Sequence, residues 1–356
     1  MKIAVLGAGN VALANAAFLS RGGHDVHVWS SFPDERDALR SAGRIGFEGF
    51  ISGEASVTAA GDVGSCLDGA SVVMIAAPAF GHRTLMSAAC PYLTEAHLVV
   101  IHPVTGLSSL LLSRMLRDRG IKPTIVDLST SLFTTRKASA NSVRLLKIKD
   151  VIDMAAMPAE RGSEAQATLE ALFGKRFRLE PNALTITLNN HNPVYHVAPM
   201  LCNLSRAEKK ENWIIWENIT PGVAKLVKLV DDERLAVVRY FGTAEVTVDE
   251  YFREAHGAYG SNLDEIFASV AQILKGPVGP QQFDHRFITE DVPYALVFYC
   301  ALGRLAGIPM PVSESLIQLT SSLYERDFFE EGHNLETLGL SGMTPRQILA
   351  VTRTGF

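Results

Sequence analysis

The sequence has only four cysteines in 356 residues, and no two of them form a CxxC pair. Cys66, Cys90, Cys202 and Cys300 lie far apart, which argues against a zinc site and against a disulfide framework. Ten histidines without HExxH-like spacing make a metal site equally unexpected. We therefore expect a protein of the reducing cytoplasm that holds no metal.

The sequence also has no run of lysine or arginine and no long apolar stretch. A formal net charge of −5 provides no electrostatic footprint for nucleic acid or for an anionic membrane. The apolar residues 3–6 are too few to span a membrane, and they lead into glycines instead of a signal-peptide cleavage site. We expect neither nucleic acid nor a membrane as a partner, and no export.

The beginning of the sequence has the pattern of a dinucleotide-binding unit. Residues 2–6 form an apolar strand, a G-x-G-x-x-A turn follows, and a helical pattern leads to a second strand at residues 25–29. Gly7 permits the tight turn, Gly9 lets the backbone approach a pyrophosphate, and the small Ala12 lets helix and strand pack closely. The residues predicted to bind the cofactor here are Gly7, Gly9, Asn10 and Val11.

The alternation of strands and helices continues to about residue 180. Apolar runs at residues 71–76 and 98–102 are typical of buried parallel strands, and the first leads into a loop with Ala77 and Pro78, which we expect to contact the cofactor. Further elements are expected as strands at residues 124–128, 143–148 and 151–157 and as a helix at residues 163–173. The pattern predicts an α/β Rossmann domain with a doubly wound parallel sheet over residues 1–180.

The choice of nicotinamide cofactor depends on the end of the second strand. An NAD enzyme usually has Asp or Glu there, whereas this sequence has Ser30 and Ser31, with Arg36 a few residues later. Two hydroxyls and no carboxylate would tolerate a 2′-phosphate, so we predict that NADPH is preferred and NADH is possible. The alternative is that the serines begin a loop and Arg36 is a solvated surface residue.

Residues 181–356 are expected to form an all-α domain. Helical patterns cover residues 194–207, 223–240, 248–254, 261–274, 294–305 and 312–324. Asn192 and Pro193 suit a helix start, which places His196 just inside the helix and His191 in the loop before it. In the stretch 284–293, Arg286 and Asp291 flank a turn; they are either functional or a helix cap with a surface ion pair.

Four segments together resemble the octopine/opine dehydrogenase family. They are GAGNVA at 7–12, LSTSLFTTR at 128–136, NPVYHVAP at 192–199 and RFITEDVP at 286–293. The resemblance implies a Rossmann domain followed by a helical domain of the 6-phosphogluconate dehydrogenase C-terminal-like type. It also implies that His196 is the general acid/base, that Asp291 is its partner, and that Arg286 binds the keto acid. His196 and Asp291 should then be adjacent, although 95 positions separate them.

The reaction that this resemblance implies is the NAD(P)H-dependent condensation of an amino acid amine with a 2-keto acid, such as pyruvate or 2-oxoglutarate, to an N-(carboxyalkyl) amino acid. One alternative is a ketopantoate-type reductase, which reduces a 2-keto acid without an amine. Another is a regulatory protein that binds NADPH without catalysis. Dependence on added amino acid separates the first two, and cofactor oxidation separates both from the third. A homodimer is expected from the family alone.

Overall fold

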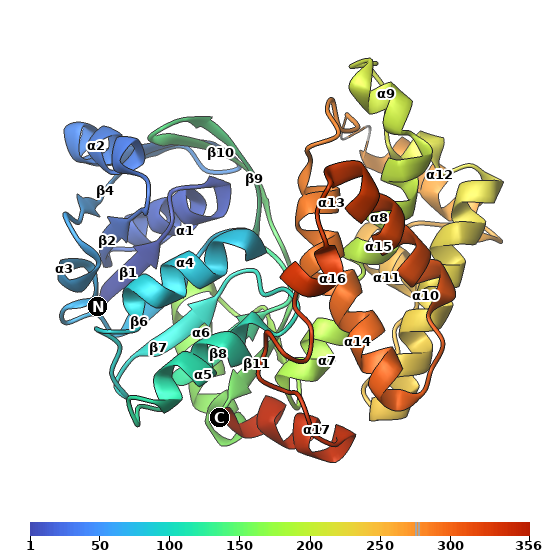
Figure 1. Ribbon diagram of the computed structural model, residues 1–356. Helices are drawn as coiled ribbons and strands as arrows, with labels where there is room; N and C mark the ends of the chain where they lie inside the picture. Colours follow the sequence, from blue (N-terminus) through green and yellow to red (C-terminus); the bar gives the residue numbers. More distant parts are fainter. Residues whose placement is uncertain (275, 277) are drawn as a thin grey trace. The chain divides into compact units, whose positions relative to one another are not determined.

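The chain folds into two compact units. The computed structural model describes all residues except 275 and 277. The first unit contains residues 1–187 and 346–356, and the second contains residues 188–345 (Figure 1). The first unit therefore extends beyond the boundary expected at residue 180. The end of the chain also returns to it, which the sequence pattern did not predict.

An eight-stranded sheet forms the centre of the first unit. In order across the sheet, the strands are β12 (Phe177–Leu179), β11 (Ile152–Met157), β8 (Thr124–Leu128), β7 (Leu98–Ile101), β6 (Val72–Ile75), β1 (Lys2–Leu6), β2 (Asp25–Trp29) and β5 (Thr58–Ala59). All neighbours are parallel except β8 and β11, which are antiparallel. The predicted Rossmann-like domain is confirmed.

Helices cover both faces of this sheet because the central strands are apolar on both sides. Helices α1 (Asn10–Arg21) and α6 (Gly162–Phe173) share one core with alternate strand residues such as Val5 and Val126. Two further helices pack on strands of this sheet: α4 (Ala79–Ala89) contacts β6, and α5 (Ser108–Arg117) contacts β8. The shorter helices are α2 (Pro33–Ala42), α3 (Val63–Leu67), η1 (Ala159–Arg161) and α7 (Ala183–Leu188), with α17 (Pro345–Thr354) near the end of the chain.

A second, four-stranded sheet packs on α1. Its order is β4 (Gly53–Ser56), β3 (Arg44–Gly49), β10 (Ser142–Ile148) and β9 (Phe133–Ser139). Val143 and Leu145 are buried in the core that α1 shares, while Arg144 between them is exposed. The strand predicted at 143–148 therefore lies in this sheet and not in the main one. Because this sheet packs on α1, residues of β9 lie next to the first turn of that helix.

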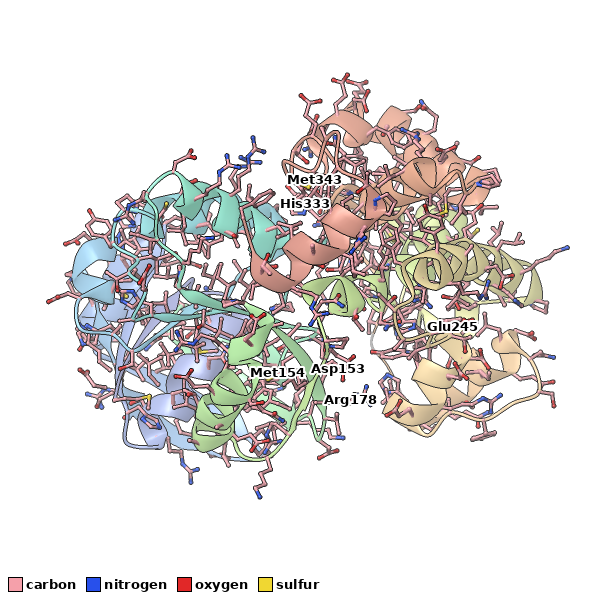
Figure 2. The ribbon with its side chains drawn as sticks, turned by 90° about the horizontal axis from the view of Figure 1, so that it is seen from below. Asp153, Met154, Arg178, Glu245, His333 and Met343 are labelled. Carbon is pink, nitrogen blue, oxygen red and sulfur yellow. The ribbon has the colours of Figure 1, made fainter. Side chains whose placement is uncertain are left out.

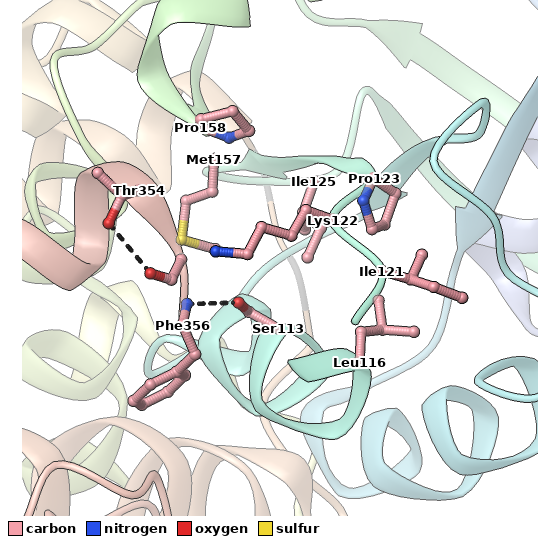
Figure 3. A pocket seen from close by; sticks show the side chains of 11 residues that line it. Ser113, Leu116, Ile121, Lys122, Pro123, Ile125, Met157, Pro158, Thr354 and Phe356 are labelled. Carbon is pink, nitrogen blue, oxygen red and sulfur yellow. Dashed lines mark hydrogen bonds between the residues drawn. The ribbon is translucent and has the colours of Figure 1, made fainter. Parts of the chain in front are cut away.

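Two contacts fix the late segments of the first unit. Across the β11–β12 pair, Arg178 Nε donates to Asp153 Oδ1 at 2.6 Å (Figure 2). At the end of the chain, Phe356 N donates to Ser113 Oγ on α5 at 2.8 Å, beside a pocket of about 240 Å³ (Figure 3). The second contact ties the residues beyond 345 to this unit.

The second unit is helical. Its elements are α8 (Asn192–Cys202), α9 (Leu204–Glu208), η2 (Trp216–Asn218), α10 (Pro221–Phe241), α11 (Val248–His256), α12 (Leu263–Leu274), α13 (Arg286–Thr289), the π-helical segment η3 (Val292–Leu296), α14 (Val297–Ala306), α15 (Pro311–Tyr324) and α16 (Phe328–Glu331). The helix predicted at 194–207 is divided at Asn203, whose Nδ2 donates to Pro199 O. In the described part of the chain, no helix is long and apolar enough to cross a membrane.

A buried carboxyl group in the main sheet makes stability depend on pH. Asp127 of β8 is fully enclosed, and its Oδ2 accepts a hydrogen bond from Ser109 Oγ at 2.6 Å. Its Oδ1 has no hydrogen-bond partner among the described residues. Burial raises the pKa of Asp127 to about 7, because a carboxylate here would lose its hydration without full replacement.

We expect Asp127→Asn to flatten the pH dependence of stability. Between about pH 4 and about pH 7, the native chain keeps a proton that the unfolded chain has lost, so the unfolding free energy falls as pH rises, by up to about 1.4 kcal/mol per pH unit. Urea unfolding from about pH 5 to about pH 8 measures this slope, with the exposed Asp118→Asn as control. Equal slopes for the wild type and Asp127→Asn would contradict the assignment.

Candidate active site

The turn between β1 and α1 has the shape that a dinucleotide pyrophosphate requires. Gly7 has a φ of +122°, and a Cβ there would lie 2.4 Å from the Ala76 carbonyl oxygen. Gly9 is the N-cap of α1; a Cβ there would meet nothing within 4 Å, and no side chain caps the helix. The first amides of α1 are therefore without side-chain partners at the positive end of the helix dipole. These residues fit the predicted cofactor.

The other residues predicted to bind the cofactor around this turn also make contacts within the protein. Asn10 is exposed, but its Oδ1 accepts a hydrogen bond from Lys137 N at 2.6 Å, so it ties α1 to β9. Val11 packs against the core at the start of α1. Ala77 and Pro78 follow β6, and Pro78 is the N-cap of α4. The strand pairing of β1 with β6 brings this loop next to the glycine turn.

A carboxylate lies at the end of β2, although neither of the two residues that follow the strand is acidic. Ser30 is buried, and its Oγ donates to Glu35 Oε2 at 2.6 Å. Arg36 Nη1 donates to Ser30 O at 2.6 Å, and its guanidinium lies over the Trp29 ring, 5.9 Å from the ring centroid. The expectation of hydroxyls without a carboxylate is therefore wrong, because α2 brings Glu35 back to the strand end. Ser31 is half-buried beside this network.

A lysine from the second sheet completes this network. Lys137 Nζ lies 2.9 Å from Glu35 Oε1 and donates to Ala8 O, also at 2.9 Å. Because Ala8 lies between the two glycines, Lys137 connects the glycine turn with the end of β2. Sequence reasoning missed Glu35 and Lys137. No local pattern marks residue 137; only the packing of β9 on α1 brings it to the turn.

The structure brings His196 and Asp291 together, as predicted. Pro193 lies in the first turn of α8, and His196 follows one turn later. Its Nδ1 lies 2.7 Å from Asp291 Oδ2, and both side chains are buried. Asp291 immediately precedes η3, a π-helical segment of the kind often found at functional sites. Nε2 of His196 has no hydrogen-bond partner among the residues that the structure describes, so it is available to a substrate.

Aromatic rings hold the imidazole in one plane. The Phe287 ring stacks on His196, with the ring centroids 3.6 Å apart and an interplanar angle of 14°. Tyr195 contacts the same imidazole edge-on at 4.6 Å. His285 Nδ1 accepts a hydrogen bond from Phe287 N, and its ring contacts Phe287 edge-on at 4.4 Å. Sequence reasoning assigned no role to Phe287 or His285, since aromatic residues there are equally typical of a core.

Arg286, the third predicted catalytic residue, has a free guanidinium. It begins α13, its side chain is exposed, and in the described parts of the chain it makes no hydrogen bond or ion pair. Its charge nevertheless reaches the buried pair. After burial, the larger cause for both groups, the Arg286 charge further lowers the pKa of His196 and partly offsets the rise in the pKa of Asp291. A planar guanidinium in this setting can bind a carboxylate through two parallel hydrogen bonds.

Burial acts in opposite directions on the pKa values of the two groups of the buried pair. Burial lowers the pKa of His196 well below its usual value, and the Arg286 charge lowers it further. Burial also raises the pKa of Asp291 to about 7. In the short hydrogen bond, His196 Nδ1 donates to the Asp291 carboxylate, which leaves the lone pair of Nε2 to act as a base. The tautomer is assigned from this geometry.

A fully buried arginine positions the segment before α8. Arg234 of α10 donates to Leu188 O and Val246 O, each at 2.7 Å, and pairs with Asp231 Oδ1 at 2.6 Å. His191 was expected in a loop; it is the buried N-cap of α8, and its Nε2 lies 2.9 Å from Val246 O. Sequence reasoning missed Arg234, because a single arginine in a helical pattern does not indicate whether its side chain is buried or exposed.

Known families match both halves of the chain. Residues 179–324 match the alpha-helical domain of NAD/NADP octopine/nopaline dehydrogenase, and residues 2–127 match the N-terminus of NAD-dependent glycerol-3-phosphate dehydrogenase. The chain is 32% identical over 347 residues to the opine dehydrogenase of Arthrobacter sp. (strain 1C), covering 96% of each chain. This protein belongs to the opine dehydrogenase family. It is an NAD(P)-dependent oxidoreductase that acts on CH–NH groups.

Relatives and solved structures agree with this assignment. Protein ocs of Agrobacterium tumefaciens (strain Ach5) is 25% identical, with 98% of each chain covered. A structure of octopine dehydrogenase with NADH and L-arginine has the same fold, with a TM-score of 0.84, 20% identity and 98% of each chain covered. NADP⁺-bound yersinopine dehydrogenase is also similar in fold, with a TM-score of 0.72, 16% identity, 99% of this chain and 97% of that chain covered.

We expect Asp291→Asn to lower kcat by roughly 10²- to 10⁴-fold, because the amide cannot stabilise an imidazolium at His196. His196→Gln should lose at least as much. Oxidation of reduced cofactor with both substrates present measures the rates, and circular dichroism checks folding. The control is Asp284→Asn, an exposed carboxylate of the same segment. Near-normal turnover in His196→Gln would reject its role.

Proposed function

We propose that His196, Asp291 and Arg286 carry the condensation of an amino acid with a 2-keto acid, pyruvate or 2-oxoglutarate, to an N-(carboxyalkyl) amino acid. The observation that supports this most directly is the buried 2.7 Å contact of His196 Nδ1 with Asp291 Oδ2. Arg286 directly precedes Phe287, the residue whose ring stacks on His196. Its guanidinium is exposed and has no partner among the described residues. Together they provide a proton carrier and an anion-binding group.

In this proposal Arg286 binds the carboxylate of the keto acid and so orients its carbonyl group. Nε2 of His196 removes a proton from the ammonium group of the amino acid, and Asp291 stabilises the imidazolium that forms. The free amine adds to the carbonyl carbon, and His196 returns the proton to the oxygen, which becomes a hydroxyl group. His196 then carries a second proton from the added nitrogen to this hydroxyl group, so that water leaves when the C=N bond forms. The reduced nicotinamide, when bound, supplies the hydride that reduces this C=N bond.

Binding of the keto acid also changes the proton affinity of His196. The Arg286 charge lowers the pKa of His196, and a bound carboxylate neutralises that charge. Keto acid binding therefore raises the pKa of His196 and favours the imidazolium when the leaving oxygen needs a proton. The free protein keeps the neutral imidazole that accepts the proton of the amine.

Arg286→Met should have two effects. Loss of the charge-assisted bidentate pair should raise KM for the keto acid at least about 30-fold. Removal of the positive charge should also raise the pKa of His196, so the corresponding limb of the pH profile of kcat/KM should move to higher pH. Steady-state kinetics across pH measure both, with the exposed Lys225→Met as a charge-matched control. An unchanged KM would assign the carboxylate to another group.

The function itself is tested by cofactor oxidation with pyruvate or 2-oxoglutarate and each of the twenty amino acids, with each keto acid also supplied alone. Oxidation that requires both substrates supports the proposal. Oxidation by keto acid alone would favour a ketopantoate-type reductase. Cofactor binding without any oxidation would favour a regulatory protein.

We propose that NADPH is the preferred cofactor. The two residues that directly follow β2 are the serines Ser30 and Ser31, and Arg36 is held beside them by its bond to Ser30 O. The charge of Glu35 is balanced by Lys137. The apparent affinities of the two reduced cofactors test this preference, and a strong preference for NADH would contradict it.

A further inference from the structure

One of the cations beside the expected adenosine ribose comes from outside the β1–α1–β2 unit. In a Rossmann domain, the ribose hydroxyls lie between the glycine turn and the end of the second strand. Lys137 connects these two places, since its Nζ donates to Ala8 O and pairs with Glu35 Oε1, each at 2.9 Å. Glu35 in turn accepts from Ser30 Oγ. The side chains of Lys137 and Glu35 are only partly exposed, at 29% and 27%.

We propose that Lys137 binds the 2′-phosphate of NADPH and that Glu35 holds its ammonium group in place until the phosphate is bound. This inference rests on the proposed preference for NADPH. When a 2′-phosphate binds at this position, Lys137 exchanges the Glu35 carboxylate for a phosphate, which has more charge and more acceptor oxygens. NADH has only a hydroxyl there and leaves the Lys137–Glu35 pair intact.

The backbone keeps Lys137 in reach of the ribose. Its N–H donates to Asn10 Oδ1 at 2.6 Å, so the residue is tied to the first turn of α1 independently of its side chain. Asn10, predicted from the sequence to contact the cofactor, has in this view a positioning role. The local charges are Lys137 and Arg36 against Glu35, an excess of one cation. A phosphate dianion is attracted to this group, while Glu35 opposes it.

Three variants test the proposal by calorimetric binding of 2′,5′-ADP, 5′-AMP, NADPH and NADH. Lys137→Met should weaken 2′,5′-ADP and NADPH by about 10- to 100-fold and leave 5′-AMP and NADH nearly unchanged. Glu35→Gln should strengthen 2′,5′-ADP relative to 5′-AMP, because the repelling carboxylate is gone. Lys137→Arg should retain most of the discrimination. The matched controls are Lys147→Met and Glu48→Gln, exposed ion-paired residues of the same second sheet.

Each outcome decides a separate point. If the wild type binds 2′,5′-ADP no more tightly than 5′-AMP, the NADPH preference is wrong and the role of Lys137 is wrong with it. If the wild type discriminates and Lys137→Met discriminates equally well, the preference stands and Lys137 is not its cause. If Lys137→Met weakens all four ligands equally, the lysine acts on a phosphate common to them, and the 2′-phosphate proposal is overturned.

Discussion

The helical unit depends on a guanidinium that has no access to water. Arg234 is fully buried, and an unpaired charge there would cost several kcal/mol, so the fold must supply acceptors from several directions. Asp231 provides a carboxylate, and the carbonyl groups of Leu188 and Val246 provide two further acceptors. Those carbonyl groups belong to the segments before α8 and before α11. The desolvation of one charge thus fixes where α8 begins, and with it the direction of His196.

Within that frame, the chemistry of His196 is set by opposing electrostatic effects. Burial and the Arg286 charge disfavour the imidazolium, while the hydrogen bond to Asp291 orients the ring and favours it. The stacked Phe287 ring excludes water from one face of the imidazole and strengthens both effects. A carboxylate bound at Arg286 would remove one of the two effects that disfavour the imidazolium.

The sequence allowed prediction of those structural features that are determined by residues close to one another in the sequence. The glycine turn, the apolar strands and the helix that carries His196 follow from periodicity and turn residues, and the His196–Asp291 contact follows from the family resemblance. Three other features depend on long-range packing. The second sheet places Lys137 on the glycine turn, α2 returns Glu35 to Ser30, and Arg234 is buried. Neither a lysine on a strand nor an arginine on a helix has a local pattern that shows where it is buried or paired.

The two groups proposed to bind anions differ in how they are held before the anion binds. Arg286 is exposed and has no ion-pair partner among the described residues, so its full charge is available to any small carboxylate, which suits a substrate that must enter and leave at each turnover. Lys137 is already paired with Glu35, so an incoming phosphate gains only the difference between two partners. A pre-paired cation therefore contributes less to anion affinity than an unpaired one, because the incoming anion must displace its carboxylate partner. In this proposal, Glu35 and the 2′-phosphate compete for one lysine.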